Sequence, residues 1–177
     1  MPDAARASKE EVLEWFDGLT EVPDEVAAAL QAVTDRPQEL RSFRPRSLAR
    51  TALAAASVTP VNVEVLSAVC ELVAAADAST LAGYEPPDLT ALAWALAAAD
   101  HRDVPAMTAI GWQLAERAWE FGTEDLAKVV LAFAELRLAH QAMMATVSME
   151  VMWKIDQFSA RSLAQVAESS ARLGYCK

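Results

Sequence analysis

An aromatic residue followed four positions later by Asp or Ser, and five positions later by Leu, recurs four times along this chain of 177 residues. The aromatic residues are Phe43, Tyr84, Phe121 and Phe158, so the spacings are 41, 37 and 37 residues. Self-similarity at a period of this length is typical of proteins that stack copies of one small helical unit. The chain is therefore predicted to be a repeat array.

Each repeat is expected to form two helices. Apolar residues recur at spacings of three and four through both halves of a repeat, which places them on one face of a helix. The repeat that begins at Tyr84 predicts a first helix over 86–99 and a second over 104–118. By the same offsets, the other repeats predict helices over 45–58, 63–77, 123–136, 141–155 and 160–173.

Residues suited to helix starts fall at several of these boundaries. Pro45 and Pro86 lie where first helices should begin, and Pro105 lies where a second helix should begin. A missing backbone N–H costs nothing in the first helical turn. Thr123 and Ser159 are expected to act as N-caps of the later first helices, because their hydroxyls can accept from a free N–H there.

The whole chain, residues 1–177, is predicted to be one all-α domain, an α-solenoid of paired-helix repeats of about 37 to 41 residues. Its units are a degenerate N-terminal capping unit (1–42), three repeats (43–83, 84–120 and 121–157) and a partial C-terminal unit (158–177). A terminal unit needs a polar outer side, because it has no outer neighbour to bury against. The count of five glycines, against abundant Ala and Leu, also favours helix.

The strings Asp88–Ala97 and Asp125–Leu136 resemble the core of the octotricopeptide repeats. That core reads aromatic-x-x-x-Asp-Leu-x-x-x-x-Trp-Ala-Leu-Ala-x-Leu. Heptatricopeptide repeats, and the helical regions that precede RAP domains, share much of it. The resemblance covers residues 43–177 well and the first 42 weakly. It implies a protein of a mitochondrion or chloroplast that binds single-stranded RNA, stabilises or processes transcripts, or belongs to a divergent organellar ribosome.

A basic run near the start of the first full repeat is the candidate contact for RNA or an acidic partner. It contains Arg36, Arg41, Arg44, Arg46 and Arg50. The chain as a whole has a net charge of −10, so its averaged field repels polyanions. A local cluster beside a helix N-terminus can still bind phosphate. The alternative is a solvated face that pairs with nearby acids such as Glu39.

The predicted helix at Leu89–Ala99 has almost no polar side. A protein-docking face is predicted on it, formed by Ala91, Trp94, Ala95 and Ala98, because small side chains allow close approach. The alternative is an ordinary central helix of the array, covered on all sides. This apolar run is roughly half of the ~20 residues that span a bilayer, so no transmembrane segment is predicted.

Three tryptophans fall on second helices of the repeats, at Trp112, Trp119 and Trp153. Methionines accompany them, at Met143, Met144, Met149 and Met152. Apolar stripes at helical spacing usually belong to a core, so these side chains are predicted to be buried in preference to forming a base-stacking platform.

Residue patterns for catalysis, cofactors or metals are weak. A phosphate-binding Gly-rich loop, a nucleophile elbow and a Cys or Ser beside a suitable His are all missing from the sequence. His101 and His140 are expected in surface turns, and no metal site is predicted around them. Cys70 and Cys176 do not form a disulfide framework, so a reducing compartment is expected. The chain is predicted not to be an enzyme and to need no cofactor.

The leading functional hypothesis is a scaffold or accessory subunit of a larger organellar assembly, a ribosome or other ribonucleoprotein, with a photosynthetic or respiratory complex as another host. Its partners would be other protein subunits, with RNA touched by the arginines. The alternative hypothesis is a free-standing binder of single-stranded organellar RNA. The organellar location follows from the family resemblance alone.

Overall fold

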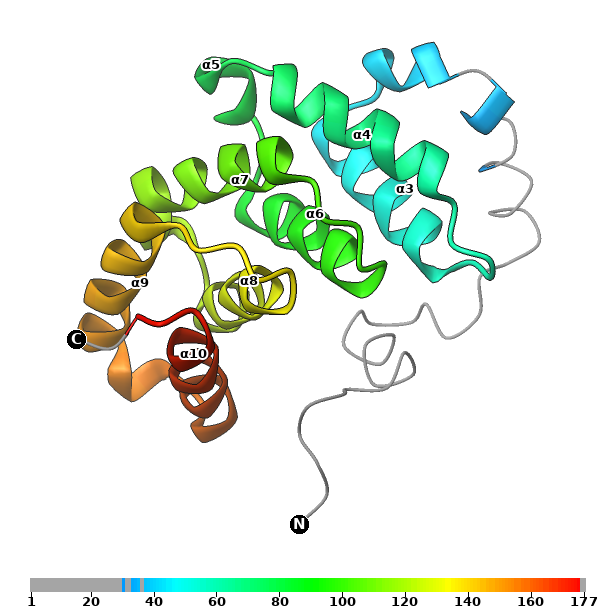
Figure 1. Cartoon of the computed structure of the whole chain (residues 1–177). Coiled ribbons are helices and arrows are strands. Elements are labelled where there is room, and N and C mark those ends of the chain that lie inside the picture. Colours follow the sequence, from blue (N-terminus) through cyan, green and yellow to red (C-terminus); the bar gives the residue numbers. More distant parts are fainter. Residues whose placement is uncertain (1–29, 31–32, 36, 176–177) are drawn as a thin grey trace.

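The computed structural model describes residue 30, residues 33–35 and residues 37–175. All regular structure within these residues is helical, which confirms the predicted all-α class. The main helices lie in two rows, side by side in a curved array (Figure 1). Each described helix falls short of the length and apolarity that crossing a membrane requires.

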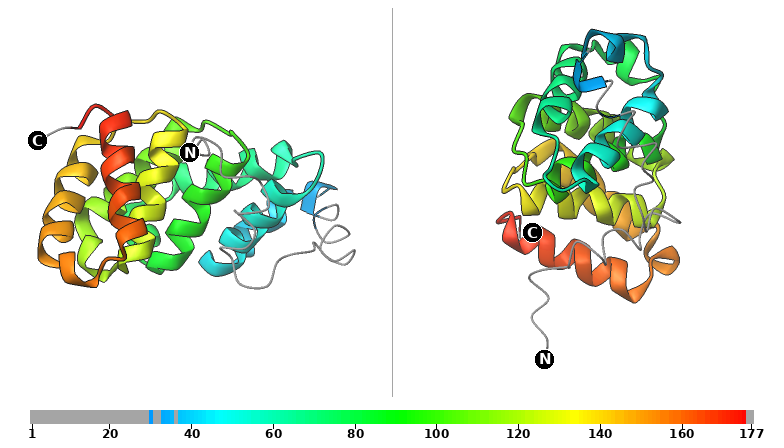
Figure 2. Two further views of the ribbon diagram at one scale, coloured as in Figure 1. Left: turned by 90° about the horizontal axis from the view of Figure 1, so that it is seen from below. Right: turned by 90° about the vertical axis from the view of Figure 1, so that its right-hand side faces the viewer.

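The first row contains α3 (Pro45–Ser57), α6 (Pro86–Ala98), α8 (Thr123–Glu135) and α10 (Ala160–Arg172), each packed against the next. The second row contains α4 (Val63–Ala75), α7 (Val104–Arg117) and α9 (Gln141–Trp153), also packed in this order. Shorter helices are η1 (Pro37–Ser42), α5 (Ala78–Leu81), η2 (Ala118–Glu120) and η3 (Ile155–Gln157). Figure 2 shows α8 and α10 side by side at the C-terminal end of the array.

The main helices start where the sequence predicted. Their first residues are 45, 63, 86, 104, 123, 141 and 160, and each ends within two residues of its predicted end. Helix α5 was not predicted; it lies in the first repeat, whose spacing to the next aromatic is 41 residues instead of 37. The Asp77 side chain caps it by accepting from the Thr80 N–H at 2.7 Å. Most of the expected capping unit, 1–42, lies outside the described residues, which include only residue 30, residues 33–35 and η1 from it.

Proline and cap positions explain these sharp starts. Pro45, Pro86 and Pro105 all occupy the first or second position of their helices, as predicted. Ser159 is the N-cap of α10, with its hydroxyl accepting from the Ser162 N–H at 3.0 Å. The N-cap predicted at Thr123 is wrong by one position, because α8 begins at Thr123 and Gly122 precedes it as the cap.

Side chains also cap all three second-row helices. Asn62, Asp103 and His140 accept from the backbone N–H three residues further on, at 3.1, 2.8 and 3.2 Å. Each such cap is typically worth about 1 kcal/mol. The prediction that His140 lies on the surface is wrong, because its ring is buried.

The His140 ring fills the space beside a glycine of the neighbouring helix. It packs edge-on against Trp112, with ring centroids 4.9 Å apart, and lies near Phe133. A Cβ on Gly111 would come within 2.7 Å of the His140 ring. The contact between α7 and the start of α9 therefore requires glycine at position 111.

The signature residues of the sequence form much of the core. Tyr84, Phe121 and Phe158 are buried, as are the signature leucines Leu89 and Leu126. Each aromatic closes the connection between one helix pair and the next. The periodic signature thus marks the junctions along the array.

Gly111→Ala is expected to destabilise the chain by about 1–3 kcal/mol, because its methyl group overlaps the buried His140 ring. Urea unfolding followed by circular dichroism measures the change. Gly122→Ala is the matched control, since a Cβ there meets only Asp125 at an ordinary 3.5 Å. Equal losses for the two variants would contradict the packing described for His140.

Stability should also fall as the pH drops below 6.5, the ordinary pKa of histidine. Burial lowers the pKa of His140, and its neutral Nδ1 must accept from the Met143 N–H. The unfolded chain therefore takes up this proton first, so stability present above 6.5 is lost toward the lower folded pKa. His140→Asn keeps a cap acceptor but does not titrate. Its unfolding free energy should change less between pH 7 and 5 than that of the unsubstituted chain.

Candidate interaction surface

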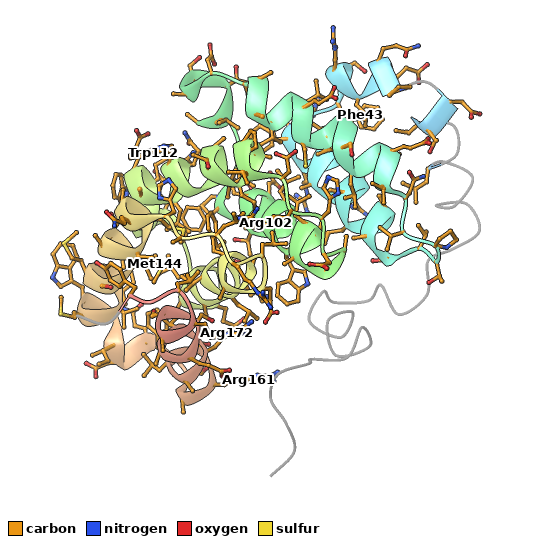
Figure 3. The ribbon with its side chains drawn as sticks, viewed as in Figure 1. Phe43, Arg102, Trp112, Met144, Arg161 and Arg172 are labelled. Atoms are coloured by element: carbon orange, nitrogen blue, oxygen red, sulfur yellow. The ribbon has the colours of Figure 1, made fainter. Side chains whose placement is uncertain are left out.

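Large apolar side chains are exposed together at the C-terminal end of the second row. They come from α7, η2, α9 and η3 and are termed here the tryptophan surface: Trp112, Trp119, Met149, Met152, Trp153 and Ile155. The three tryptophans are 52%, 63% and 75% exposed. Figure 3 shows Trp112 at the outer side of the array, on α7 beside α9.

The prediction that these tryptophans belong to the core is therefore wrong. Met143 and Met144 are buried as predicted, whereas Met149 and Met152 are exposed. A second-row helix packs against the first row with one face and against its row neighbours with its sides. Its remaining face meets solvent, so an apolar stripe there cannot be distinguished from a core stripe by spacing alone.

Packing between helices brings the members of the tryptophan surface together. Met149, Met152 and Trp153 share one face of α9 because they are spaced by three and four residues. Helix α9 packs along α7 and contacts η2, which contains Trp119. These side chains therefore lie on neighbouring elements, with Trp112 beside the start of α9 and Met152 and Trp153 at its end.

A buried ion pair holds this region in shape. Lys154 Nζ lies 2.9 Å from Glu150, whose side chain is almost fully buried. The same ammonium donates to the carbonyl oxygens of Trp119, at 3.1 Å, and Phe121, at 3.2 Å. It thereby ties the end of α9 to the turn before α8.

Arg117 makes the equivalent contacts at the end of α7. Its guanidinium donates to the carbonyl oxygens of Ala82, at 3.1 Å, and Tyr84, at 3.3 Å. It also donates to the buried Gln113 and pairs with Glu120 at 2.7 Å. Sequence reasoning missed these two cations, although Arg117 and Lys154 both lie four residues before a signature aromatic.

The charges around the tryptophan surface are mainly acidic. Glu116 follows Trp112 by one helical turn, Glu120 lies beside Trp119, and Asp156 adjoins Ile155; all three acids are exposed. Arg117 is paired with Glu120 and Lys154 with the buried Glu150, so Glu116 and Asp156 are the acids that give the rim its charge. An apolar centre with an acidic rim results.

The docking face predicted on α6 is wrong. Ala91, Trp94 and Ala95 are buried within the chain itself, and Ala98 is half-buried. Helices α3 and α8 pack on the two sides of α6, so the small side chains serve contacts inside the array. The alternative interpretation, an ordinary central helix, fits the structure.

The predicted arginines lie at the opposite end of the array. Arg36 is outside the described residues, and Arg41, Arg44, Arg46 and Arg50 are exposed on η1 and α3. Burial raises the pKa of Asp88, at the start of α6, and the Arg46 charge partly offsets this rise. Arg46 therefore already faces an acid of its own chain.

A polar cleft lies between the last two first-row helices. Its cavity of about 220 Å³ is lined by Glu124 and Lys128 of α8 and by Arg161 and Gln165 of α10, with Ser159 and Ser162 at its end. An ion pair between Arg172 and Glu135, at 2.7 Å, joins the same two helices. Mixed charge of this kind offers hydrogen bonds to a polar ligand.

Comparison with models of known protein families finds no match, and comparison with curated protein sequences finds none either.

Lys154→Met should cost about 3 kcal/mol of stability, because it leaves the buried Glu150 carboxylate without its cation. The double variant Glu150→Leu/Lys154→Met should recover the part of this loss that comes from the stranded carboxylate, whereas the loss of the hydrogen bonds to the Trp119 and Phe121 carbonyls remains. Denaturant unfolding of the two single variants and the double variant measures the coupling. Additive losses would show that the pair is not coupled as its geometry indicates.

Proposed function

We propose that this chain is a non-enzymatic scaffold subunit of a larger assembly, which docks a neighbouring protein on its tryptophan surface. The observation that carries this proposal is the exposure of three tryptophans and three aliphatic or thioether side chains on neighbouring elements of the second row. Large apolar side chains that are exposed close together are uncommon on soluble monomers, and large exposed apolar patches mark interaction sites. Tryptophan is also prominent among residues that dominate binding energy at interfaces.

The proposal includes the finer architecture, an α-solenoid of repeats of 37 to 41 residues. Equivalent side chains support it: the caps Asp103 and His140 are separated by 37 residues, as are the cations Arg117 and Lys154. Each cation reaches back to the same two carbonyl positions of its own helix pair. In a solenoid, equivalent contacts of this kind are repeated from unit to unit.

The partner that fits this surface is an amphipathic helix with a basic polar face. Its apolar side would cover the tryptophans and methionines, as helix-in-groove partners do. Its Lys and Arg side chains would meet Glu116 and Asp156 at the rim, where complementary charge steers association. Placement of the assembly in a mitochondrion or chloroplast is supported by the resemblance of residues 43–177 to octotricopeptide repeats.

RNA binding is the second candidate function, and two features favour it. Exposed arginines lie on η1 and α3, and the polar cleft between α8 and α10 presents hydrogen-bonding side chains on the first row. Single-stranded RNA is read by such groups when its bases are unstacked. The acidic net charge of −10 weighs against this function.

The variant Trp119→Ser/Trp153→Ser should lose the assembly that co-purifies with the tagged chain from its native cells. Because both side chains are mostly exposed, its stability should stay within about 0.5 kcal/mol of that of the unsubstituted chain. Affinity purification at physiological salt, followed by identification of the bound subunits, provides the measurement. Arg46→Ser/Arg50→Ser is the matched control and should retain them.

The opposite pattern would favour RNA binding. In that case the purified chain binds single-stranded RNA at physiological salt, affinity falls steeply with added salt, and Arg46→Glu/Arg50→Glu abolishes it. Retention of the whole assembly by the double tryptophan variant would overturn docking at this surface.

A further inference from the structure

Three side chains that commonly bind transition metals meet where α4 contacts the turn between α6 and α7. Cys70 Sγ, a ring nitrogen of His101 and a carboxylate oxygen of Asp103 all lie within 4.8 Å of one another. Cys70 is buried, whereas His101 and Asp103 are half-buried. Sequence spacing does not reveal this cluster, because α5 and α6 lie between Cys70 and the other two residues along the chain.

Backbone and side-chain contacts hold the turn that presents His101 and Asp103. The His101 N–H donates to the Leu96 carbonyl at 2.9 Å, and the Asp103 N–H donates to the His101 carbonyl at 3.1 Å. Arg102, between them, donates to the Leu136 carbonyl at 3.1 Å. One Asp103 oxygen caps α7 through the Ala106 N–H, which leaves the other oxygen for a ligand.

We propose that Cys70, His101 and Asp103 bind one zinc-class divalent ion, with water completing a tetrahedral shell. Thiolate, imidazole and carboxylate are the three ligand types that zinc prefers. Bonds of about 2.0–2.3 Å place tetrahedral ligand atoms roughly 3.3–3.8 Å apart. The ion would therefore draw the three atoms together by about 1–1.5 Å from their present 4.8 Å limit.

The local charges suit a cation once the thiol loses its proton. Burial raises the pKa of Cys70 to about 12, with the Asp103 carboxylate adding to the rise, so the metal-free thiol is protonated at neutral pH. As the sulfur–metal bond forms, this proton leaves to solvent. The thiolate and the Asp103 carboxylate then supply two negative charges, which offset the positive end of the α7 dipole.

The site belongs to a single junction of the array. At the next junction, Leu138 takes the place of His101 and His140 takes the place of Asp103, each 37 positions further on. Gly111 takes the place of Cys70: it faces the His140 ring, as Cys70 faces Asp103. That set offers a single ligand group, and its ring nitrogen already accepts from the Met143 N–H. A bound ion would thus tie α4 to the α6–α7 turn, and would do so independently of the tryptophan surface.

Titration of the purified, reduced, full-length chain with Co²⁺ tests the proposal. A tetrahedral cobalt–thiolate site gives a near-ultraviolet charge-transfer band and intense visible absorption, and Zn²⁺ should displace both. Cys70→Ser should abolish the charge-transfer band, and His101→Asn should weaken cobalt binding at least tenfold, as even outer-shell changes do. Cys176→Ser is the matched thiol control and should leave the spectrum unchanged.

Saturating Zn²⁺ should also raise the midpoint of thermal unfolding of the unsubstituted chain, because the ion binds the folded state. It should not raise the unfolding midpoint of Cys70→Ser. Circular dichroism is the check that this variant folds. Absence of the charge-transfer band at millimolar Co²⁺ would overturn the site. So would a band that persists in Cys70→Ser but disappears in Cys176→Ser.

Discussion

The array depends on how the carbonyl groups of its junctions are satisfied. Burial of the signature aromatics Tyr84 and Phe121 draws the backbone of each junction toward the interior. A carbonyl group without a partner there would cost free energy comparable to a lost hydrogen bond. Arg117 and Lys154 meet this need from the ends of α7 and α9, so each helix pair closes on its own starting turn. Register between the two rows follows from these contacts.

Closure of each pair determines which surfaces remain for partners. Because every pair packs against the next in both rows, a central first-row helix such as α6 has neighbours on both sides. Its alanines allow those neighbours to approach closely, and little of α6 reaches solvent. The outer faces of α7 and α9 have no such neighbour among the described residues. Trp112 packs against the His140 ring with part of its side chain, but more than half of each of the three tryptophans meets solvent there.

Local features of the fold could be predicted from sequence, because they depend on neighbours in the chain. The aromatic period and the positions of Pro45, Pro86 and Pro105 located helix starts, since proline and cap requirements are local. Burial of Trp94 and exposure of Trp112 could not be separated in this way. Both lie on apolar helical stripes, and only the packing of other helices decides which stripe is covered.

The candidate sites were harder to predict for the same reason. Cys70 meets His101 and Asp103 only when two helix pairs stack, so no spacing within one repeat reveals the cluster. His140 has the sequence context of a surface turn, yet the missing side chain of Gly111 opens a place for its ring. The arginine cluster could be located as a basic run in the sequence, but the exposure of its side chains does not show what they bind.

Magnitudes favour protein docking over RNA binding for this chain. Each tryptophan carries roughly 150–250 Å² of surface, so burying the exposed parts of three removes about 285–475 Å² from water. At about 25 cal/mol per Å² this corresponds to roughly 7–12 kcal/mol before the cost of association. Four exposed arginines, one of them facing Asp88, release few counterions, and that gain shrinks at physiological salt. Apolar burial is less sensitive to salt, and the acidic rim that repels RNA would attract a basic helix to the same surface.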